Sequence, residues 1–392
     1  MCSMARRPPW FLMEYPLIDM REVSLFRRCL SLVMLTALCA ELGACAGRPD
    51  AAVLDPVRVS GSIDRQLTVL TATNRSSENG GYSSKRNGTL SFEEFSVAIP
   101  PSHRPSNIEW PVGKPDADKD MVVVKRHALD QKQFVAMAQA PNREEAVGIF
   151  VHGYNYTFQE SLYRLAQVAA DSKTDGTPIL FSWPSQGALA GYLADRDAAL
   201  ASRDRLVWLV NTAAAKTDVK RVILFGHSVG GFLIMETLRQ LRLEGKDDVL
   251  GKIVVVLAAP DIDDDLFKSQ LEVVGRMRTP ITLFVSKDDK ALAVSSFLSG
   301  ERPRAGSLNV DSPSVRDAAV RYGLRIVDIS SVKAADGVGH DRYANLAQLG
   351  PQLAKLNGGA ASAPEAGSFV FDVAASVVSS PFRLAGAVVG QR

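Results

Sequence analysis

A serine stands between two glycines in the stretch VILFGHSVGGFLIMETL, residues 222–238. The apolar run before it predicts a buried strand, and the apolar residues after it recur at helical spacing. A serine on so sharp a strand-to-helix turn is exposed above the end of a sheet, where its hydroxyl can meet a base and a substrate. Gly226 and Gly230 leave room for the tight backbone. The motif predicts that Ser228 is a nucleophile.

Candidates for the base and the acid follow later strands. His340 lies in DGVGHDRY beyond the last predicted strand, and Asp288 and Asp289 end an earlier one. A serine hydroxyl is a poor nucleophile at neutral pH, so a histidine must accept its proton and a carboxylate must orient the imidazole. We expect His340 as the base and Asp289 as the acid, with Asp288 as the alternative. The acidic run 260–265 also ends a strand, and helix capping near residue 264 is its other explanation.

The remaining parts of such a site are donors for the oxyanion and walls for the substrate. The N–H of Val229, directly after the serine, is the first expected donor, and the N–H of Tyr154 beside Gly153 is the second. Trp183, in SWPS, either lines an acyl pocket or forms a rigid turn that packs on the sheet. His152 and His227 lie beside these elements and complete the expected substrate-binding set.

The elements that must position these residues alternate regularly from about residue 145. Apolar strands alternate with helical patterns as far as LRIVDIS, which predicts a parallel sheet with helices on both faces. Before this region, residues 67–74 and 92–100 predict two strands, separated by a polar loop at 75–90 and followed by irregular chain at 101–120. The predicted class is α/β, doubly wound, in one domain over residues 66–356, and ligands bind such sheets at the carboxyl ends of the strands.

All four cysteines lie near the N-terminus, which excludes a disulfide framework or a cysteine metal site in the rest of the chain: Cys2, Cys29, Cys39 and Cys45. Residues 20–44 have the basic start, short apolar stretch and small residues of a secretory signal. The segment 42–45, LGAC, resembles a bacterial lipobox. The alternative is an ordinary cleaved signal with a chance cysteine. We expect a lipid anchor at Cys45 and a place in the bacterial cell envelope, on the periplasmic side of the inner or outer membrane.

The two ends of the chain carry further expectations. Residues 1–19 fit no part of a signal and indicate a start codon further downstream, while 45–65 predict a tether. Residues 357–392 predict a flexible linker and an apolar tail, in which Asp372, Pro381 and Arg383 argue against a spanning helix. The net charge of +2, without a basic run, argues against a nucleic-acid partner. No sequence pattern predicts a metal or another cofactor.

Five stretches, in this order, resemble one protein family: FVHGYNYTFQESLYRLAQVAAD, FSWPSQGALAGYLADRDAALASRDRL, FGHSVGGFLIMETLRQL, VVLAAPDIDDDLF and VSKDDKALAVS. They are similar to bacterial esterase- or lipase-like proteins of the α/β-hydrolase fold that were once catalogued only as a domain of unknown function and are often membrane-anchored. The resemblance extends over about residues 67–350 and implies Asp289 as the acid. The usual elbow of that family is Ala-His-Ser-Met-Gly, and the replacements Gly226 and Val229 keep its turn.

These observations together predict a serine hydrolase that cleaves carboxylic ester or related acyl bonds through an acyl-enzyme. No long insertion indicates a lid, so we expect an open cleft for small or medium acyl esters. Two alternatives use the same fold. One is a catalytically silent envelope scaffold or lipid-binding lipoprotein, and the other is an acyltransferase with the same three residues.

Overall fold

The computed structural model describes residues 48–59, 63–140, 145–172, 176–346 and 383–385. A single sheet runs through the described chain. Its strands are β1 (Gln66–Glu78), β2 (Gly81–Ala98), β3 (Val122–Leu129), β4 (Ala146–Val151), β5 (Ile179–Ser182), β6 (Arg221–His227), β7 (Ile253–Ala258), β8 (Ile281–Val285), β9 (Leu324–Asp328) and β10 (Arg383–Ala385).

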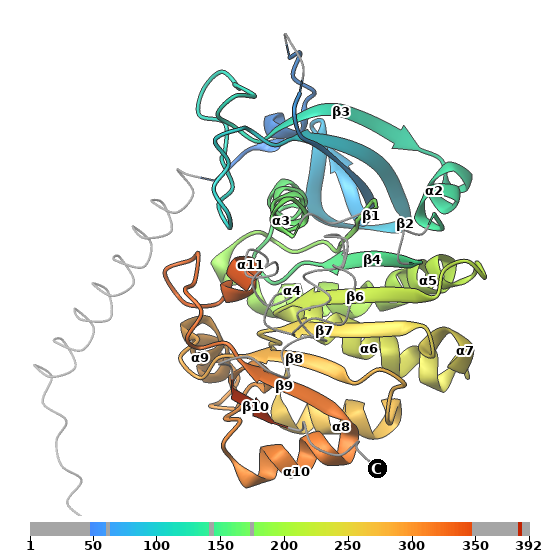
Figure 1. Cartoon of the computed structure of the whole chain (residues 1–392), viewed down its shortest axis with the longest axis vertical. Coiled ribbons are helices and arrows are strands. Elements are labelled where there is room, and N and C mark those ends of the chain that lie inside the picture. The colour runs from blue at the N-terminus through green and yellow to red at the C-terminus, as the bar shows by residue number, and fades with distance from the viewer. Residues whose placement is uncertain (1–47, 60–62, 141–144, 173–175, 347–382, 386–392) are drawn as a thin grey trace, which may run out of the picture. The chain divides into compact units, whose positions relative to one another are not determined.

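The ten strands lie in the order β10-β9-β8-β7-β6-β4-β5-β1-β2-β3, as Figure 1 shows. The pairs from β1 through β5, β4, β6, β7 and β8 to β9 are all parallel. Antiparallel pairing is confined to the two edges, where β2 and β3 extend one side and β10 the other. A mostly parallel sheet brings the carboxyl ends of its central strands to a common edge.

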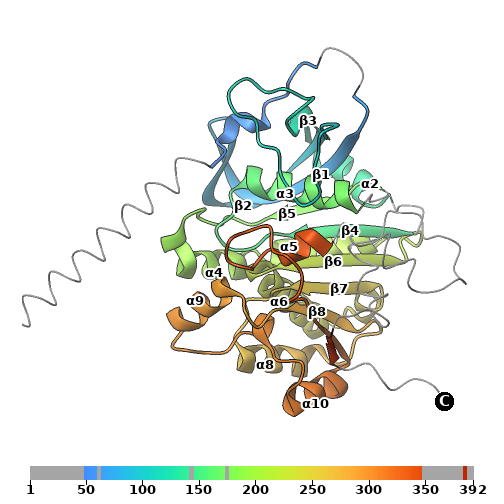
Figure 2. The same ribbon diagram turned by 60° about the vertical axis from the view of Figure 1, so that its left-hand side comes forward.

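Helices cover both faces of the sheet (Figure 2). Their bounds are η1 (Ala51–Leu54), α2 (Gln131–Ala138), α3 (Phe158–Asp171), η2 (Leu189–Gly191), α4 (Tyr192–Ala201), α5 (Arg203–Ala214), α6 (Val229–Leu243), α7 (Asp247–Leu250), α8 (Asp264–Val274), α9 (Lys290–Leu298), η3 (Ala305–Ser307), α10 (Pro313–Tyr322) and α11 (Arg342–Leu346).

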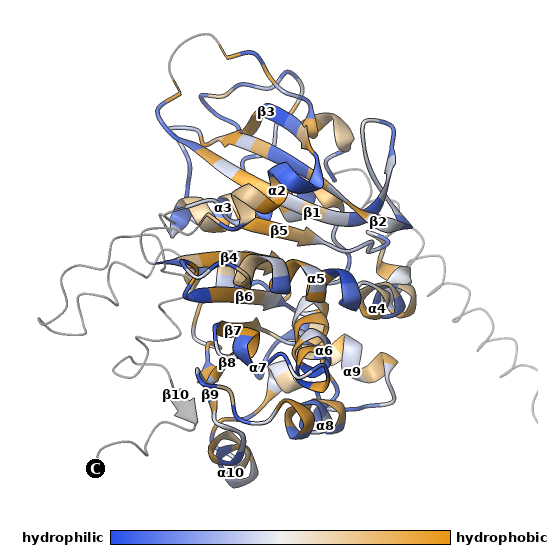
Figure 3. Ribbon diagram, turned by 90° about the vertical axis from the view of Figure 1, so that its right-hand side faces the viewer, coloured by the Kyte–Doolittle hydropathy of each residue, from blue (hydrophilic) through white to orange (hydrophobic). Residues whose placement is uncertain are grey.

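Successive side chains of the central strands enter two separate cores. In β6, Leu224 packs in the core with α4, α5, α6 and α8, whereas Phe225 packs in the core with α3 and α11. This alternation follows from the two-residue period of a strand. Both faces are buried, which explains why the central strands are mostly apolar, as Figure 3 shows for β4, β5 and β6. The predicted α/β class with a doubly wound, mostly parallel sheet is confirmed.

The N-terminal strands are much longer than predicted. The segment 75–90, expected to be a polar loop, belongs almost entirely to β1 and β2, which pair antiparallel as a hairpin. Its turn is Asn79-Gly80, with φ of 49° and 76°. Asn-Gly at positive φ is the favoured two-residue hairpin turn, because its twist matches that of the strands. The many polar residues led to a loop prediction, although the turn itself occupies only this dipeptide.

Further differences concern elements that the sequence patterns did not predict, and two helices that they predicted as one. The strand β3 and the helices α2 and α10 had no counterpart in the predicted pattern. The sequence from Gly191 to about Ala215 predicts one long helical region, but the structure divides it at Ser202 into α4 and α5. The Ser202 hydroxyl donates to the carbonyl oxygen of Ala198 and accepts from Asn74 of β1, which ties this break to the sheet.

The predicted tether, 45–65, is not free chain where the structure describes it. The compact unit begins at Pro49, and Leu54 of η1 is fully buried against β2, β3 and α3. The Val57 N–H donates to the Val123 carbonyl at 2.8 Å, and Gln159 of α3 donates to the Pro49 carbonyl at 2.8 Å. The domain therefore starts well before residue 66.

Several predictions about the ends of the chain lie outside the described residues. These are the start at 1–19, the signal at 20–44, the lipidation of Cys45 and most of the segment 357–392. From that last segment only β10 is described, and it pairs antiparallel with β9. Among the described residues, no helix has both the length and the apolar character to cross a membrane.

Replacing Leu54 by Ala tests whether η1 is part of the domain. The substitution would leave a cavity under β2 and β3, so we expect the free energy of unfolding to fall by about 2–5 kcal/mol in urea titrations. The control is Leu243→Ala, since Leu243 is 59% exposed at the end of α6. Equal stability of the two variants would contradict the docking of η1.

Candidate active site

Ser228 occupies a strained turn between β6 and α6. Its φ of 53° and ψ of −121° are rare for a residue with a side chain. The glycines beside it are required by close packing. A Cβ at Gly230 would collide with the carbonyl oxygens of Val151 and His152, and a Cβ at Gly226 would lie 2.9 Å from the Gly230 backbone. The turn therefore directs the serine away from the strand at the carboxyl edge of the sheet, the arrangement typical of a nucleophile.

Asp289, and not Asp288, lies against His340. The distance from His340 Nδ1 to Asp289 Oδ2 is 2.7 Å. The other oxygen of Asp289 accepts from the Leu292 N–H at 3.0 Å, so this carboxylate also caps α9. Asp288 turns the other way, where it accepts from Arg342 at 2.8 Å and from Ser286 at 2.7 Å. The two adjacent aspartates thus have separate partners.

Burial and the neighbouring carboxylates have opposite effects on the pKa of His340. Burial alone would lower the pKa of His340. The hydrogen bond and charge of Asp289, together with the charges of Asp261 and Asp336, outweigh burial and raise the pKa above its ordinary value. A histidine with this environment is a stronger base than a free imidazole, and its protonated form is stabilised by the carboxylate behind it.

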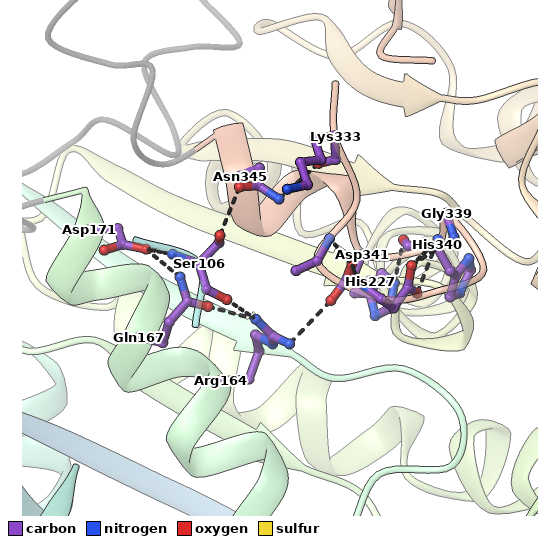
Figure 4. Close-up of polar contacts among 12 residues, drawn as sticks. Ser106, Arg164, Gln167, Asp171, His227, Lys333, Gly339, His340, Asp341 and Asn345 are labelled. Carbon is purple, nitrogen blue, oxygen red and sulfur yellow. Dashed lines mark hydrogen bonds and ion pairs between the residues drawn. The ribbon is translucent and has the colours of Figure 1, made fainter. Parts of the chain in front are cut away.

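Two aspartates shape the loop that carries His340. Asp336 accepts from the N–H groups of Gly339 and His340, at 2.7 and 3.1 Å. Asp341 accepts from the N–H groups of Ala335 and Asp336 and from Arg164 of α3, the last at 3.2 Å. Figure 4 shows Arg164 and Asp341 joined between α3 and this loop. Neither aspartate was predicted as part of the site, although acidic side chains that bind nearby N–H groups are common in tight loops.

His227, the residue before Ser228, contacts His340. Its Nε2 donates to the His340 carbonyl at 3.2 Å, and the two rings have centroids 4.6 Å apart. Burial and the neighbouring His340 lower the pKa of His227 well below its ordinary value, so it stays neutral. Within the described residues, the Ser228 hydroxyl and the His340 ring do not form a hydrogen bond. In structures without substrate, such catalytic contacts are often long.

The two expected oxyanion donors flank the serine. Val229 begins α6, so its N–H has no acceptor within the helix. Gly153 lies directly beside the serine, since a Cβ at Gly153 would stand 2.9 Å from Ser228 Cβ. Tyr154 follows Gly153, and its hydroxyl donates to the carbonyl oxygens of Ala188 and Leu189 at the start of η2. The loop of residues 152–157 therefore lies beside Ser228.

A buried arginine and a buried aspartate hold this loop. Arg75 of β1 is 1% exposed, and it donates to the carbonyl of Tyr156 at 2.9 Å and to the carbonyl of Ser185 at 3.0 Å. Asp195 of α4 accepts from the Asn155 N–H at 3.2 Å and from the Ser185 hydroxyl at 2.6 Å. Burial lowers the pKa of Arg75 to about 9, against the opposing charges of Asp195 and Glu160.

The roles of these two residues differ from expectation. Arg75 was missed, because it lies in the segment predicted as a polar loop. The sequence places Asp195 in the charged stretch YLADRDAALASRD, residues 192–204, which predicts helix-surface ion pairs or contacts that hold this helix over the site. The structure buries it completely, and burial raises the pKa of its carboxyl. The buried hydrogen bonds of Arg75 and Asp195 fix the geometry of the loop of residues 152–157.

Trp183 and His152 lie beneath the site, which corrects the expectation of direct substrate contact. Both side chains are fully buried, and their rings stack with centroids 4.8 Å apart. The Trp183 indole N–H donates to the His152 carbonyl at 2.8 Å. Burial and the charge of Arg75 lower the pKa of His152 to about 3. Trp183 thus follows the packing alternative, and the two rings support the turn that bears Gly153.

The acidic run 260–265 serves helix capping and a buried polar cluster. Asp263 caps α8 by accepting from the Leu266 N–H at 3.0 Å. Asp261 is buried and accepts from Tyr192 at 2.9 Å and from Ser295 at 2.6 Å, while its own N–H donates to the Ser228 carbonyl. Asp261 does not hydrogen bond to His340 in the described structure.

A pocket of about 650 Å³ opens beside this cluster, between α4, α8 and the segment after α9. It is lined by Tyr192, Leu193, Arg196, Asp197, Asp263, Leu266, Ser299, Arg302 and Arg304. Across the part of the chain that the structure describes, no three His, Cys, Asp or Glu side chains gather as a metal site would require.

Comparison with known proteins finds one family. The family model described as "Alpha/beta hydrolase of unknown function (DUF900)" matches residues 128–356. No curated protein matches the chain.

Several solved structures share features of the fold at low identity. A putative hydrolase from Agrobacterium vitis S4 is 11% identical, with a TM-score of 0.29 over 61% of this chain and 94% of its own. Esterase Est22 with p-nitrophenol is 13% identical, with a TM-score of 0.33 over 75% and 77%. Brefeldin A esterase, a bacterial homologue of human hormone sensitive lipase, is 12% identical, with a TM-score of 0.27 over 66% and 69%.

The pairing of Asp289 with His340 predicts a specific change in titration. In Asp289→Asn the carboxylate charge is lost and only the charges of Asp261 and Asp336 remain to oppose burial, so the pKa of His340 falls relative to the parent chain. Proton NMR of the imidazole, assigned with His340→Gln, measures this directly. Asp288→Asn is the control, since Asp288 pairs with Arg342. An equal effect of the two substitutions would contradict the assignment of Asp289.

Proposed function

This chain belongs to the family of α/β hydrolases of unknown function, and we propose that it is a serine hydrolase that cleaves carboxylic ester bonds. One observation carries the proposal. At the carboxyl edge of the sheet, beside the strained turn of Ser228, the imidazole of His340 is held by Asp289 at 2.7 Å. The combination of a strained serine, a histidine of raised pKa and a buried carboxylate behind it suits nucleophilic attack on an acyl group.

In the proposed reaction, the Ser228 oxygen attacks the acyl carbon while His340 Nε2 takes the hydroxyl proton. The carbonyl oxygen becomes an oxyanion, held by the N–H groups of Val229 and Tyr154. Collapse of this intermediate expels the alcohol, which takes the proton from His340, and leaves an ester on Ser228. Water then attacks with His340 again as base, and the acid is released.

The proposed cellular location rests on the sequence near the N-terminus. A lipid-modified Cys45 would hold the domain in the bacterial cell envelope, next to small or medium acyl esters. Support for this part of the proposal comes from the lipobox-like LGAC motif at residues 42–45. The expected polypeptide after cleavage is the compact unit from Pro49 with a short segment before it.

Labelling with a fluorophosphonate probe tests the nucleophile and its partners. We expect Ser228→Ala to abolish labelling, and His340→Ala and Asp289→Asn to slow it by about 100-fold or more, because general-base catalysis contributes roughly 10²–10⁴-fold. Matched controls are His127→Ala, which removes an exposed histidine of β3, and Asp288→Asn. Labelling that persists in Ser228→Ala would overturn the proposal.

The raised pKa of His340 predicts the pH dependence of hydrolysis. Only the neutral imidazole can accept the serine proton, so kcat/KM for a p-nitrophenyl ester should rise with pH through an apparent pKa above that of a free imidazole. Asp289→Asn should lower the rate and move the inflection to lower pH. A profile that shows no change across the neutral range would exclude His340 as the base.

A further inference from the structure

Large apolar side chains are exposed on three neighbouring elements beside the site, η2, α4 and α9. Leu189 of η2 and Leu193 of α4 are 59% and 76% exposed. Val294, Phe297 and Leu298 of α9 are 58%, 72% and 58% exposed. We call these five residues the apolar rim. Monomeric soluble proteins seldom gather exposed apolar residues in this way, and such patches mark contact surfaces.

The orientation of α9 is unusual for a surface helix. Its buried side carries Leu292 and Ser295, and Ser295 is bound to Asp261 and Tyr192. Its outward side carries Val294, Phe297 and Leu298. A surface helix in water normally presents polar residues outward. The outer face of α9 is therefore suited to an apolar environment.

The apolar rim flanks the approach to Ser228. The helix α9 begins at Asp289, which holds His340, and η2 accepts the hydroxyl of Tyr154 from the oxyanion loop. The Tyr192 and Ser295 hydroxyls, 2.8 Å apart, join α4 to α9. Figures 2 and 3 show α4 and α9 as neighbours. A protein partner covering both helices would obstruct the entry of substrate, whereas a lipid layer would supply it.

The beginning of the domain lies at the same edge of the sheet. Gln159, in the first turn of α3 directly after the oxyanion loop, donates to the Pro49 carbonyl at 2.8 Å. Cys45 stands four residues before Pro49. Four residues span at most about 14 Å. A lipid chain attached at Cys45 would thus hold this edge, and not the opposite one, close to a membrane.

Basic side chains accompany the rim. Lys287 and Lys290 are exposed at the start of α9, on either side of Asp288 and Asp289. Lysines beside an apolar surface favour contact with anionic headgroups while the apolar side chains enter the acyl region. This charge pattern fits a lipid layer that contains anionic lipid.

We propose that the apolar rim is a lipid-docking surface and that the enzyme takes its ester substrate from a lipid layer. The docking rests on the exposed side chains and, through the proposed lipid anchor at Cys45, on the position of Pro49. The substrate class, an acyl ester presented by a membrane, also rests on the proposed function. The two parts are separated by measuring docking and hydrolysis independently.

Docking is measured by tryptophan quenching in the full chain reconstituted into vesicles of phosphatidylethanolamine and phosphatidylglycerol, with and without brominated acyl chains. Phe297→Trp should gain emission that brominated lipid quenches, relative to the parent chain. Leu243→Trp is the matched control, with 59% exposure at the far end of α6, about 21 Å along the helix from the elbow. Quenching that is equal for the two variants, or absent at position 297, would overturn the docking surface.

Hydrolysis is measured with one fluorogenic ester dissolved in water and a long-chain ester embedded in the vesicles. The double variant Phe297→Asp/Leu298→Asp should lower the ratio of embedded to dissolved ester turnover at least tenfold. Leu243→Asp/Val320→Asp, exposed elsewhere, should leave this ratio unchanged. An unchanged ratio in the rim variant would overturn the lipid-borne substrate.

The remaining outcomes separate the two proposals. If position 297 is quenched but neither ester is cleaved by any variant, docking stands and the hydrolase function fails. If the dissolved ester is cleaved and position 297 is not quenched, the hydrolase function stands and docking fails. If Phe297→Asp/Leu298→Asp converts a dimer into a monomer in size-exclusion chromatography, a second copy covers the rim and the docking proposal is wrong.

Discussion

The site depends on one constraint, the backbone conformation of Ser228, which is rare for a residue with a side chain. The turn is sharp because β6 and α6 follow each other with almost no connecting chain. Where β4, β6 and α6 cross, positions 226 and 230 have room only for glycine. Strain of this kind costs roughly 1–3 kcal/mol and persists only when surrounding packing determines it. The two apolar cores on either side of the sheet provide that packing.

The loops around the elbow are fixed by a different force. Arg75 and Asp195 hold the oxyanion loop, and Arg164 and Asp341 hold the loop of His340. Ion pairs and charged hydrogen bonds in such places gain little net stability, because burial removes their hydration. Their effect is geometric, since each binds backbone groups of a loop that apolar packing alone would leave free to shift. The hydrophobic cores thus support the strands, and buried charges place the catalytic loops.

The parallel direction of the central strands places the candidate site and the apolar rim at the same edge of the sheet. Because the central strands end at one edge, Ser228, His340, Asp289 and the loop of residues 152–157 share that edge with η2, α4 and α9. The same edge carries the apolar rim and the attachment of Pro49 to α3. A soluble esterase has no physical need for exposed Phe297 and Leu298 there, whereas an enzyme that works against a lipid layer does.

The sequence by itself determined the sheet class, the elbow and the set of candidate residues, because these follow from local patterns: apolar runs, helical spacing and a Gly-x-Ser-x-Gly turn. The family resemblance favoured Asp289 over its neighbour Asp288, but only the tertiary structure shows which of the two carboxylates meets His340, since this depends on where the loop of His340 returns. The tertiary structure also decided that Trp183 is buried and that Arg75 supports a loop distant in sequence. Those contacts join separate segments, and no local periodicity encodes them.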